Sequence, residues 1–259
     1  MAFLDIWHIM WIFIYFLGAY VLCMWLKTKT PQVQRSVIYG LILINFVIHF
    51  VGPAWTRDTL SEWVLHVSML NICAVLVFVS PFLYWQQDRF LKPGWVYMSI
   101  IGALGLLIFP EYAIGQDPLS FHMIRLFGQH ALLFFVPILM IRLDHVKLRW
   151  RDTWTSSVFL VMILITVIAN AAVMEVLGVV TNMRRINGAF QWHPGSLATV
   201  VDWAIPDVFM TVPFGPAAGD AVYWPLFYML PVFILFIFPV TLGINAIDKG
   251  LRDWLAKRQ

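Results

Sequence analysis

The chain has 259 residues, of which 61% are hydrophobic and 12% are charged. A soluble domain carries about 25% charged residues, so this composition excludes an ordinary soluble protein and indicates a polytopic membrane protein. The formal net charge of +3 reflects basic residues placed in loops; membrane lipids are the expected partners, and nucleic acid is not.

Long apolar segments separated by short connections predict an all-α membrane protein of about seven transmembrane helices. About 20 apolar residues are needed to cross the hydrocarbon core, and the segments form one transmembrane domain over residues 1–259. The fourth segment is the shortest; it contains Gly102 and Gly105 and ends at Pro110, so a tilted or partly re-entrant helix is an alternative there. The predicted spans are residues 6–26, 36–55, 64–85, 95–109, 121–142, 155–179 and 222–247.

The basic residues fall almost entirely in alternate loops. The loops after the first, third and fifth segments and the C-terminal tail hold 13 of the 17 Lys and Arg residues. Because cytoplasmic loops carry the excess of basic residues, this pattern predicts an outer N-terminus and a cytoplasmic C-terminus. The four basic residues left on the outer side are Arg57, Arg125, Arg184 and Arg185.

One long connection, residues 180–221, falls on the predicted outer side and is rich in Gly, Pro and aromatic residues. Long connections without structure of their own are uncommon and often functional. Aromatic rings are favoured at the membrane interface, so this stretch is predicted to form an outer loop or cap. The alternative is an ordinary loop with interfacial anchors.

Four polar side chains on different segments lie at nearly the same predicted depth. Cys73, His130 and Asn170 are nine residues from the outer ends of their segments, and Asn45 is ten. At a rise of 1.5 Å per residue this is about 13–15 Å below the outer boundary. Asn71 lies just above Cys73. Polar groups inside a bilayer normally face the bundle interior or a wet cavity, so these residues predict a polar site.

Each of these residues also has a structural interpretation. A buried Cys usually behaves as a small hydrophobe, a membrane His is often a hydrogen-bonded structural residue, and buried Asn residues hold helices together. The two cysteines, Cys23 and Cys73, lie at different depths and cannot bridge. No metal-binding spacing or cofactor motif is present, so neither a metal nor a cofactor is expected.

Several short stretches of sequence resemble a known family. The stretch Ser68-Met69-Leu70-Asn71-Ile72-Cys73 is similar to the third helix of YwaF-like bacterial integral membrane proteins, where Leu-Pro-Leu-His-Leu-Cys is typical. Here Met69 and Asn71 replace the Pro and the His. Phe127-Gly128-Gln129-His130 looks like the fifth-helix His of that group, and Asn170 and Thr181-Asn182 look like its Asn and Asn-Tyr positions. The group is related to transmembrane protein 164 and, more distantly, to the androgen-induced-gene lipid hydrolases.

The resemblance implies a cysteine-dependent phospholipid acyltransferase or lipid hydrolase of a bacterial plasma membrane. Cys73 would then be the nucleophile and His130 its base. The residues expected to bind substrate, orient the base or stabilise the oxyanion are Asn45, Asn71, Asn170 and Asn182.

Two other classes of function are compatible with the same residues. A small-molecule permease or substrate-binding membrane protein would use the polar plane as a binding site and needs a polar path towards the inner face. A structural or signalling protein would use the Asn residues only to hold its helices together. The sequence does not fix an oligomeric state.

Overall fold

A computed structural model describes residues 5–54, 63–64, 67–69, 71–88, 90–108, 113, 115–179 and 230–256. Within these residues the protein is helical, with seven α-helices and one short 3-10 helix, η2 (Trp150–Asp152). This confirms the predicted all-α polytopic membrane fold. The helices are α1 (Ile6–Lys27), α2 (Pro31–Ala54), α4 (Ile72–Trp85), α5 (Leu91–Ile108), α6 (Phe121–Arg142), α7 (Trp154–Val176) and α9 (Leu230–Ala256).

The helices differ in length in a way that matters for the site. Four of them, α1, α2, α6 and α7, are long and apolar enough to cross a membrane, whereas α4 and α5 are shorter apolar helices. The 14 residues of α4 rise only about 21 Å, which is less than the roughly 30 Å thickness of the hydrocarbon core. The predicted 64–85 helix is therefore wrong in extent, because its regular part begins at Ile72.

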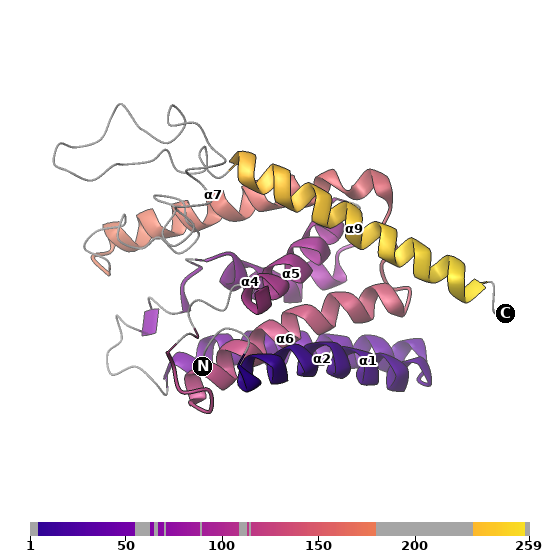
Figure 1. Cartoon of the computed structure of the whole chain (residues 1–259). Helices are drawn as coiled ribbons and strands as arrows, with labels where there is room; N and C mark the ends of the chain where they lie inside the picture. The colour runs from indigo at the N-terminus through magenta and orange to yellow at the C-terminus, as the bar shows by residue number, and fades with distance from the viewer. Residues whose placement is uncertain are drawn as a thin grey trace.

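Helix α5 lies in the middle of the bundle (Figure 1). It packs against α6 on one side and α7 on the other, and it also contacts α4. Helix α6 in turn packs against α1 and α2, while α9 lies against α7. The predicted fourth segment, 95–109, is thus a regular internal helix of 18 residues.

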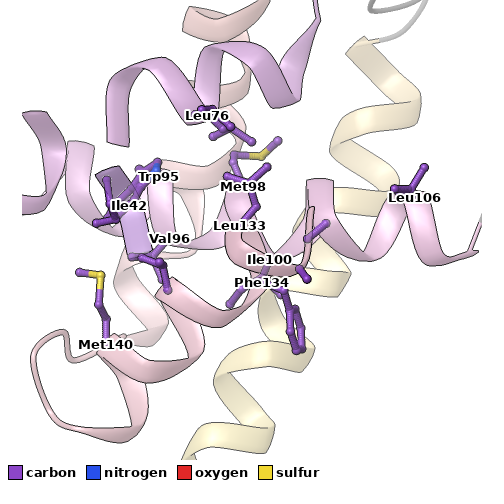
Figure 2. Packing of buried hydrophobic residues seen from close by; sticks show 14 of the residues in the cluster. Ile42, Leu76, Trp95, Val96, Met98, Ile100, Leu106, Leu133, Phe134 and Met140 are labelled. Atoms are coloured by element: carbon purple, nitrogen blue, oxygen red, sulfur yellow. The ribbon is translucent and has the colours of Figure 1, made fainter. Parts of the chain in front are cut away.

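The core is built from apolar side chains on facing helices. Figure 2 shows residues of α2, α4, α5 and α6 converging, among them Ile42, Leu76, Met98 and Leu133, all in one buried cluster. The opposite faces of outer helices such as α1 carry exposed large apolar side chains, as expected where lipid is the neighbour. Because lipid tails are as apolar as Leu, close packing of side chains contributes most of the helix association here.

The basic loops meet at one end of the bundle. The Tyr84 hydroxyl donates to the carbonyl of Arg35 over 3.2 Å, and Lys92 Nζ donates to the carbonyl of Tyr84 over 2.7 Å. At the same end, Arg252 near the C-terminus of α9 pairs with Asp144 in the loop after α6. These contacts bring together the loops that the sequence places on the cytoplasmic side; the orientation itself stays a prediction from the charges.

Candidate functional site

Cys73 lies in the first turn of α4. Asn71 has extended backbone angles (φ −141°, ψ 164°), and its Oδ1 accepts a hydrogen bond from the Ala74 N–H over 2.7 Å. It is therefore the N-cap, and the N–H groups of Ile72 and Cys73 have no acceptor within the helix. The thiol thus lies at the positive end of the helix dipole, which favours negative charge.

The surroundings of the thiol come from α1 and α5. A Cβ placed on Gly102 would lie 3.7 Å from Cys73 Sγ, so the missing side chain leaves room beside the sulfur. The fully buried Tyr15 of α1 has its hydroxyl within electrostatic range of the thiol. Cys73 itself is partly exposed.

His130 has a defined tautomer. Its Nδ1 lies 2.8 Å from the carbonyl oxygen of Leu126 in the preceding turn of α6. A carbonyl only accepts, so Nδ1 carries the proton of the neutral ring and Nε2 keeps its lone pair. With its free lone pair, Nε2 can accept a proton as a general base.

Cys73 and His130 do not hydrogen-bond to each other among the contacts of the described chain. Tyr15 lies between their helices, because its hydroxyl donates to the carbonyl of Phe127 over 3.0 Å, one turn before His130 on α6. Trp11 stacks on the ring of Phe127 at a centroid distance of 5.0 Å and fixes the same turn. Helix α1 therefore positions the α6 turn that carries the imidazole.

Among the described residues, some buried amide atoms on α2, α6 and α7 lack hydrogen-bond partners; α2 packs against α6, whereas α7 packs mainly against α5. Asn45 Nδ2 donates to the Gln129 carbonyl over 3.2 Å. This bond places Asn45 of α2 beside the residue that precedes His130, in agreement with the nearly equal depth predicted for Asn45 and His130. Within the described part of the chain, Asn45 Oδ1, Gln129 Nε2 and Asn170 Nδ2 are buried without a hydrogen-bond partner. Each such group costs about 1–3 kcal/mol. Unsatisfied groups of this kind in a native structure call for a water or a ligand.

The remaining predicted site residues have different outcomes. Asn71 is the cap of α4, a role that the sequence argument did not give it. Asn182 and the stretch 180–221 lie outside the described residues. Tyr15, Gln129 and Gly102 were not predicted as site residues. Counting residues from the outer end of each segment would have found Tyr15, because it is nine residues from the start of α1.

A second group of polar residues, near the inner end of α5, α7 and α9, was also missed. The Tyr97 hydroxyl donates to Asn245 Oδ1 over 2.7 Å, and Asn245 Nδ2 donates to Thr153 Oγ1 over 3.0 Å. Thr241 Oγ1 donates to Ser156 Oγ over 3.1 Å in the same region. These side chains satisfy one another and join three helices, so this inner network is structural.

A model of the TMEM164 family matches residues 3–242, nearly the whole chain. The chain belongs to the TMEM164 family. No match was found among curated proteins or among solved structures. Family membership agrees with the predicted relation to transmembrane protein 164, and together with the apolar helices it identifies a multi-pass membrane protein.

In this TMEM164-family protein, three chemical groups are candidates for a site, although no hydrogen bond joins Cys73 to His130 in the described part of the chain. Cys73 supplies a thiol, the first turn of α4 supplies two backbone donors, and His130 supplies an unprotonated ring nitrogen. The matched range includes all three. Such a set is suited to acyl transfer, in which negative charge develops first on sulfur and then on a carbonyl oxygen.

Proposed function

We propose that the protein is a membrane-embedded lipid acyltransferase or acyl-ester hydrolase, with Cys73 as the nucleophile and His130 as its general base. The observation that carries the proposal is the position of Cys73 in the first turn of α4, directly after the N-cap Asn71 and Ile72. There the N–H groups of Ile72 and Cys73 are free of helical acceptors, and we propose that they bind the oxyanion. One donor of this kind contributes about 2.7–4 kcal/mol to catalysis.

In the first half-reaction, His130 Nε2 takes the thiol proton while Cys73 Sγ attacks the carbonyl carbon of a lipid acyl ester. The carbonyl oxygen becomes an oxyanion held by the two backbone N–H groups. The ester C–O bond then breaks, and the imidazolium returns the proton to the leaving lipid alcohol. A thioester on Cys73 remains.

In the second half-reaction, a hydroxyl group attacks the thioester carbonyl and gives its proton to His130. Collapse of the intermediate breaks the C–S bond, and the proton returns to the thiolate. Water as the second nucleophile makes the protein a hydrolase, and a lipid alcohol makes it an acyltransferase. Asn45, which already bonds to the carbonyl of the residue before His130, is proposed to orient the acceptor or the imidazole, and Asn170 and Asn182 are proposed for the same task from the family pattern.

The depth of the site supports a phospholipid substrate. His130 is nine residues from the start of α6, about 13 Å below the outer end of that helix. A lipid of the outer leaflet presents its ester bonds near the upper acyl chains, at a comparable level. The thiol and imidazole must come into hydrogen-bond contact when the lipid binds, since catalytic hydrogen bonds often tighten only in the complex. As resemblance to YwaF-like proteins implies, the location is a bacterial plasma membrane.

The test is covalent labelling of the purified protein in nanodiscs with a lipid-like acylating probe, read by mass spectrometry. The expected result is one acyl adduct on Cys73, with labelling at least about tenfold slower in His130→Gln. Cys23→Ser is the matched control, because Cys23 is a buried thiol near the C-terminal end of α1, away from Tyr15 and Cys73. Equal labelling of wild type and His130→Gln, or turnover of labelled phospholipid that survives in Cys73→Ser, would contradict the covalent scheme.

A permease or substrate-binding protein is the second candidate. The observation that favours it is the pair of orphan amide atoms Asn45 Oδ1 and Gln129 Nε2 on the facing helices α2 and α6, which a bound polar molecule would satisfy without any reaction. Under this alternative, an Asn45→Leu variant loses ligand retention in a binding assay, while Cys73→Ser keeps it. The first candidate predicts loss of turnover in Cys73→Ser.

A further inference from the structure

A hollow opens at the end of the bundle where the basic loops meet. It lies between the α4–α5 loop and the loop from α6 to η2, and its lining includes Asp88, Lys92, His145, Lys147, Arg149 and Asp152. Its volume is about 160 Å³, whereas about 10–15 Å³ measured in this way suffices for one water. The hollow is therefore large enough for a tetrahedral oxyanion with some of its hydration.

Both walls are fixed by local hydrogen bonds. Asp88 Oδ1 accepts from the N–H groups of Phe90 and Leu91, each over 2.6 Å, at the start of α5. On the other side, Asp144 has a positive φ of 60°, and the N–H groups of His145 and Val146 both donate to the Met140 carbonyl, over 2.9 and 3.0 Å. The loop after α6 is thus tightly turned and holds the hollow open.

The charges that face the hollow are mainly positive. Lys92, Lys147 and Arg149 line it, and Arg35 lies within electrostatic range of both Lys92 and His145. The two acids are engaged elsewhere. The Asp88 carboxylate caps α5, and Asp152 lies 3.9 Å from Arg151. The lining thus carries three cations and two carboxylates, with the charge of Arg35 nearby.

His145 adds a hydrogen-bonding group. Its Nε2 is buried and has no hydrogen-bond partner among the described residues. Burial lowers the pKa of this imidazole, and the positive charges of Arg35 and Lys92 lower it further, while Asp144 acts in the opposite sense. The surrounding positive charges therefore disfavour protonation of the His145 ring, and a bound anion would offset their repulsion.

The level of the hollow identifies the kind of anion. Trp85 ends α4, and Trp150 begins η2, so both lie beside the two loops that form the hollow. Their side chains are exposed, as is that of Trp154 at the start of α7. Trp residues mark the membrane–water interface. The hollow is thus at the height of lipid head groups, where basic pockets between helices bind anionic lipids.

We propose that this hollow is a binding site for the phosphate of an anionic lipid head group in the leaflet on the basic side. Lys147 and Arg149 contact the phosphate oxygens, His145 Nε2 hydrogen-bonds to it, and Lys92 and Arg35 supply the surrounding charge. The site is at the opposite end of the bundle from Cys73 and does not depend on the proposed acyl chemistry.

The experiment measures binding of short-chain phosphatidylglycerol to the full-length protein in detergent by native mass spectrometry. The Lys147→Gln/Arg149→Gln double variant is compared with a Lys29→Gln/Lys249→Gln control. Both pairs are exposed and at the same end of the bundle, but only the first lines the hollow. We expect the Kd to rise at least tenfold in the first pair and less than twofold in the control.

Parallel titrations use short-chain phosphatidylcholine and inorganic phosphate. Weak binding of both, by a factor of ten or more relative to phosphatidylglycerol, supports an anionic lipid site. Phosphate alone binding as tightly as the lipid overturns the lipid assignment and identifies a site for a free phosphate group. Equal losses in the two double variants overturn the site altogether, because general attraction to a basic surface then explains the binding.

Discussion

At the scale of the residue, two opposing effects act on the Cys73 thiol. Removal of an anion from water costs several kcal/mol even after relaxation of the protein. A helix N-terminus returns about 0.3–1 kcal/mol, and up to about 2 kcal/mol when partly buried. The dipole of α4 is therefore too weak to keep a free thiolate. In the proposed mechanism, proton transfer to His130 therefore has to accompany the attack.

Gly102 controls access to the sulfur. A leucine there projects towards a thiol that lies 3.7 Å from the position of the new Cβ, so Gly102→Leu should slow alkylation of Cys73 by a small neutral maleimide about tenfold. Gly105→Leu is the control on the same helix, because a Cβ there meets nothing within 4 Å. The measurement is the rate of modification by mass spectrometry. Equal rates in both variants would show that the reagent reaches the sulfur from another side.

At the scale of the element, the start of α4 depends on one side chain. Replacing Asn71 by Ala removes the acceptor of the Ala74 N–H, and loss of such a cap typically costs about 0.5–2 kcal/mol. Asn71→Ala should therefore lower the thermal midpoint in detergent by a few degrees. Asn71→Asp keeps the acceptor and should stay close to wild type. A strong loss of activity in Asn71→Asp, at unchanged midpoint, would instead indicate contact of the side-chain amide with substrate.

The inner network supplies a second prediction for an element contact. Hydrogen bonds between membrane helices average about 0.6 kcal/mol, but an orphaned buried polar group costs about 1–3 kcal/mol. Asn245→Ala leaves the Tyr97 hydroxyl without a partner and removes the donor to Thr153 Oγ1, which keeps its bond to the Trp150 carbonyl, so it should destabilise the protein more than Tyr97→Phe. A double-mutant cycle on thermal or denaturant unfolding should give a coupling of about 0.5–1 kcal/mol for this pair. A coupling near zero would mean that the bond does not join α5 to α9.

Apolar length predicted most elements but not their internal breaks. The 121–142 segment agrees with α6 because Ser120 caps one end and Arg142 closes the other. The 64–85 segment was too long because hydropathy is blind to a backbone turn within an apolar run, although Asn71 was the available cap signal. Depth counting placed Asn45 beside the α6 turn of His130. The hydrogen bond from Tyr15 to the Phe127 carbonyl depends on α1 and α6 being neighbours. A single sequence does not show which helices pack together.

At the scale of the whole molecule, one arginine ties the last helix to the rest of the basic end. Arg252 donates to Asp144, to Asp248 over 2.9 Å and to the Ile141 carbonyl over 3.1 Å. A single exposed ion pair contributes about 0.2–1 kcal/mol, and this cluster joins α9 to the end of α6 at several points. Arg252→Gln should therefore lower stability by about 1 kcal/mol and loosen the α9 C-terminal turns first.

The same cluster predicts a dependence on pH. The hydrogen bond from Arg252 lowers the pKa of the Asp144 carboxyl, with the charges of Arg252 and Lys147 acting in the same direction and partial burial opposing them. A carboxyl whose pKa is lower in the folded state stabilises that state above its unfolded pKa, near 3.9, and loses the contribution as the pH falls through the folded value. The difference in thermal midpoint between wild type and Arg252→Gln should thus be constant from pH 7 to 5 and shrink below about pH 4. Lys249→Gln removes an exposed charge from the same helix and should follow wild type throughout, whereas a gap that stays constant down to pH 3 would exclude Asp144 as the partner that matters.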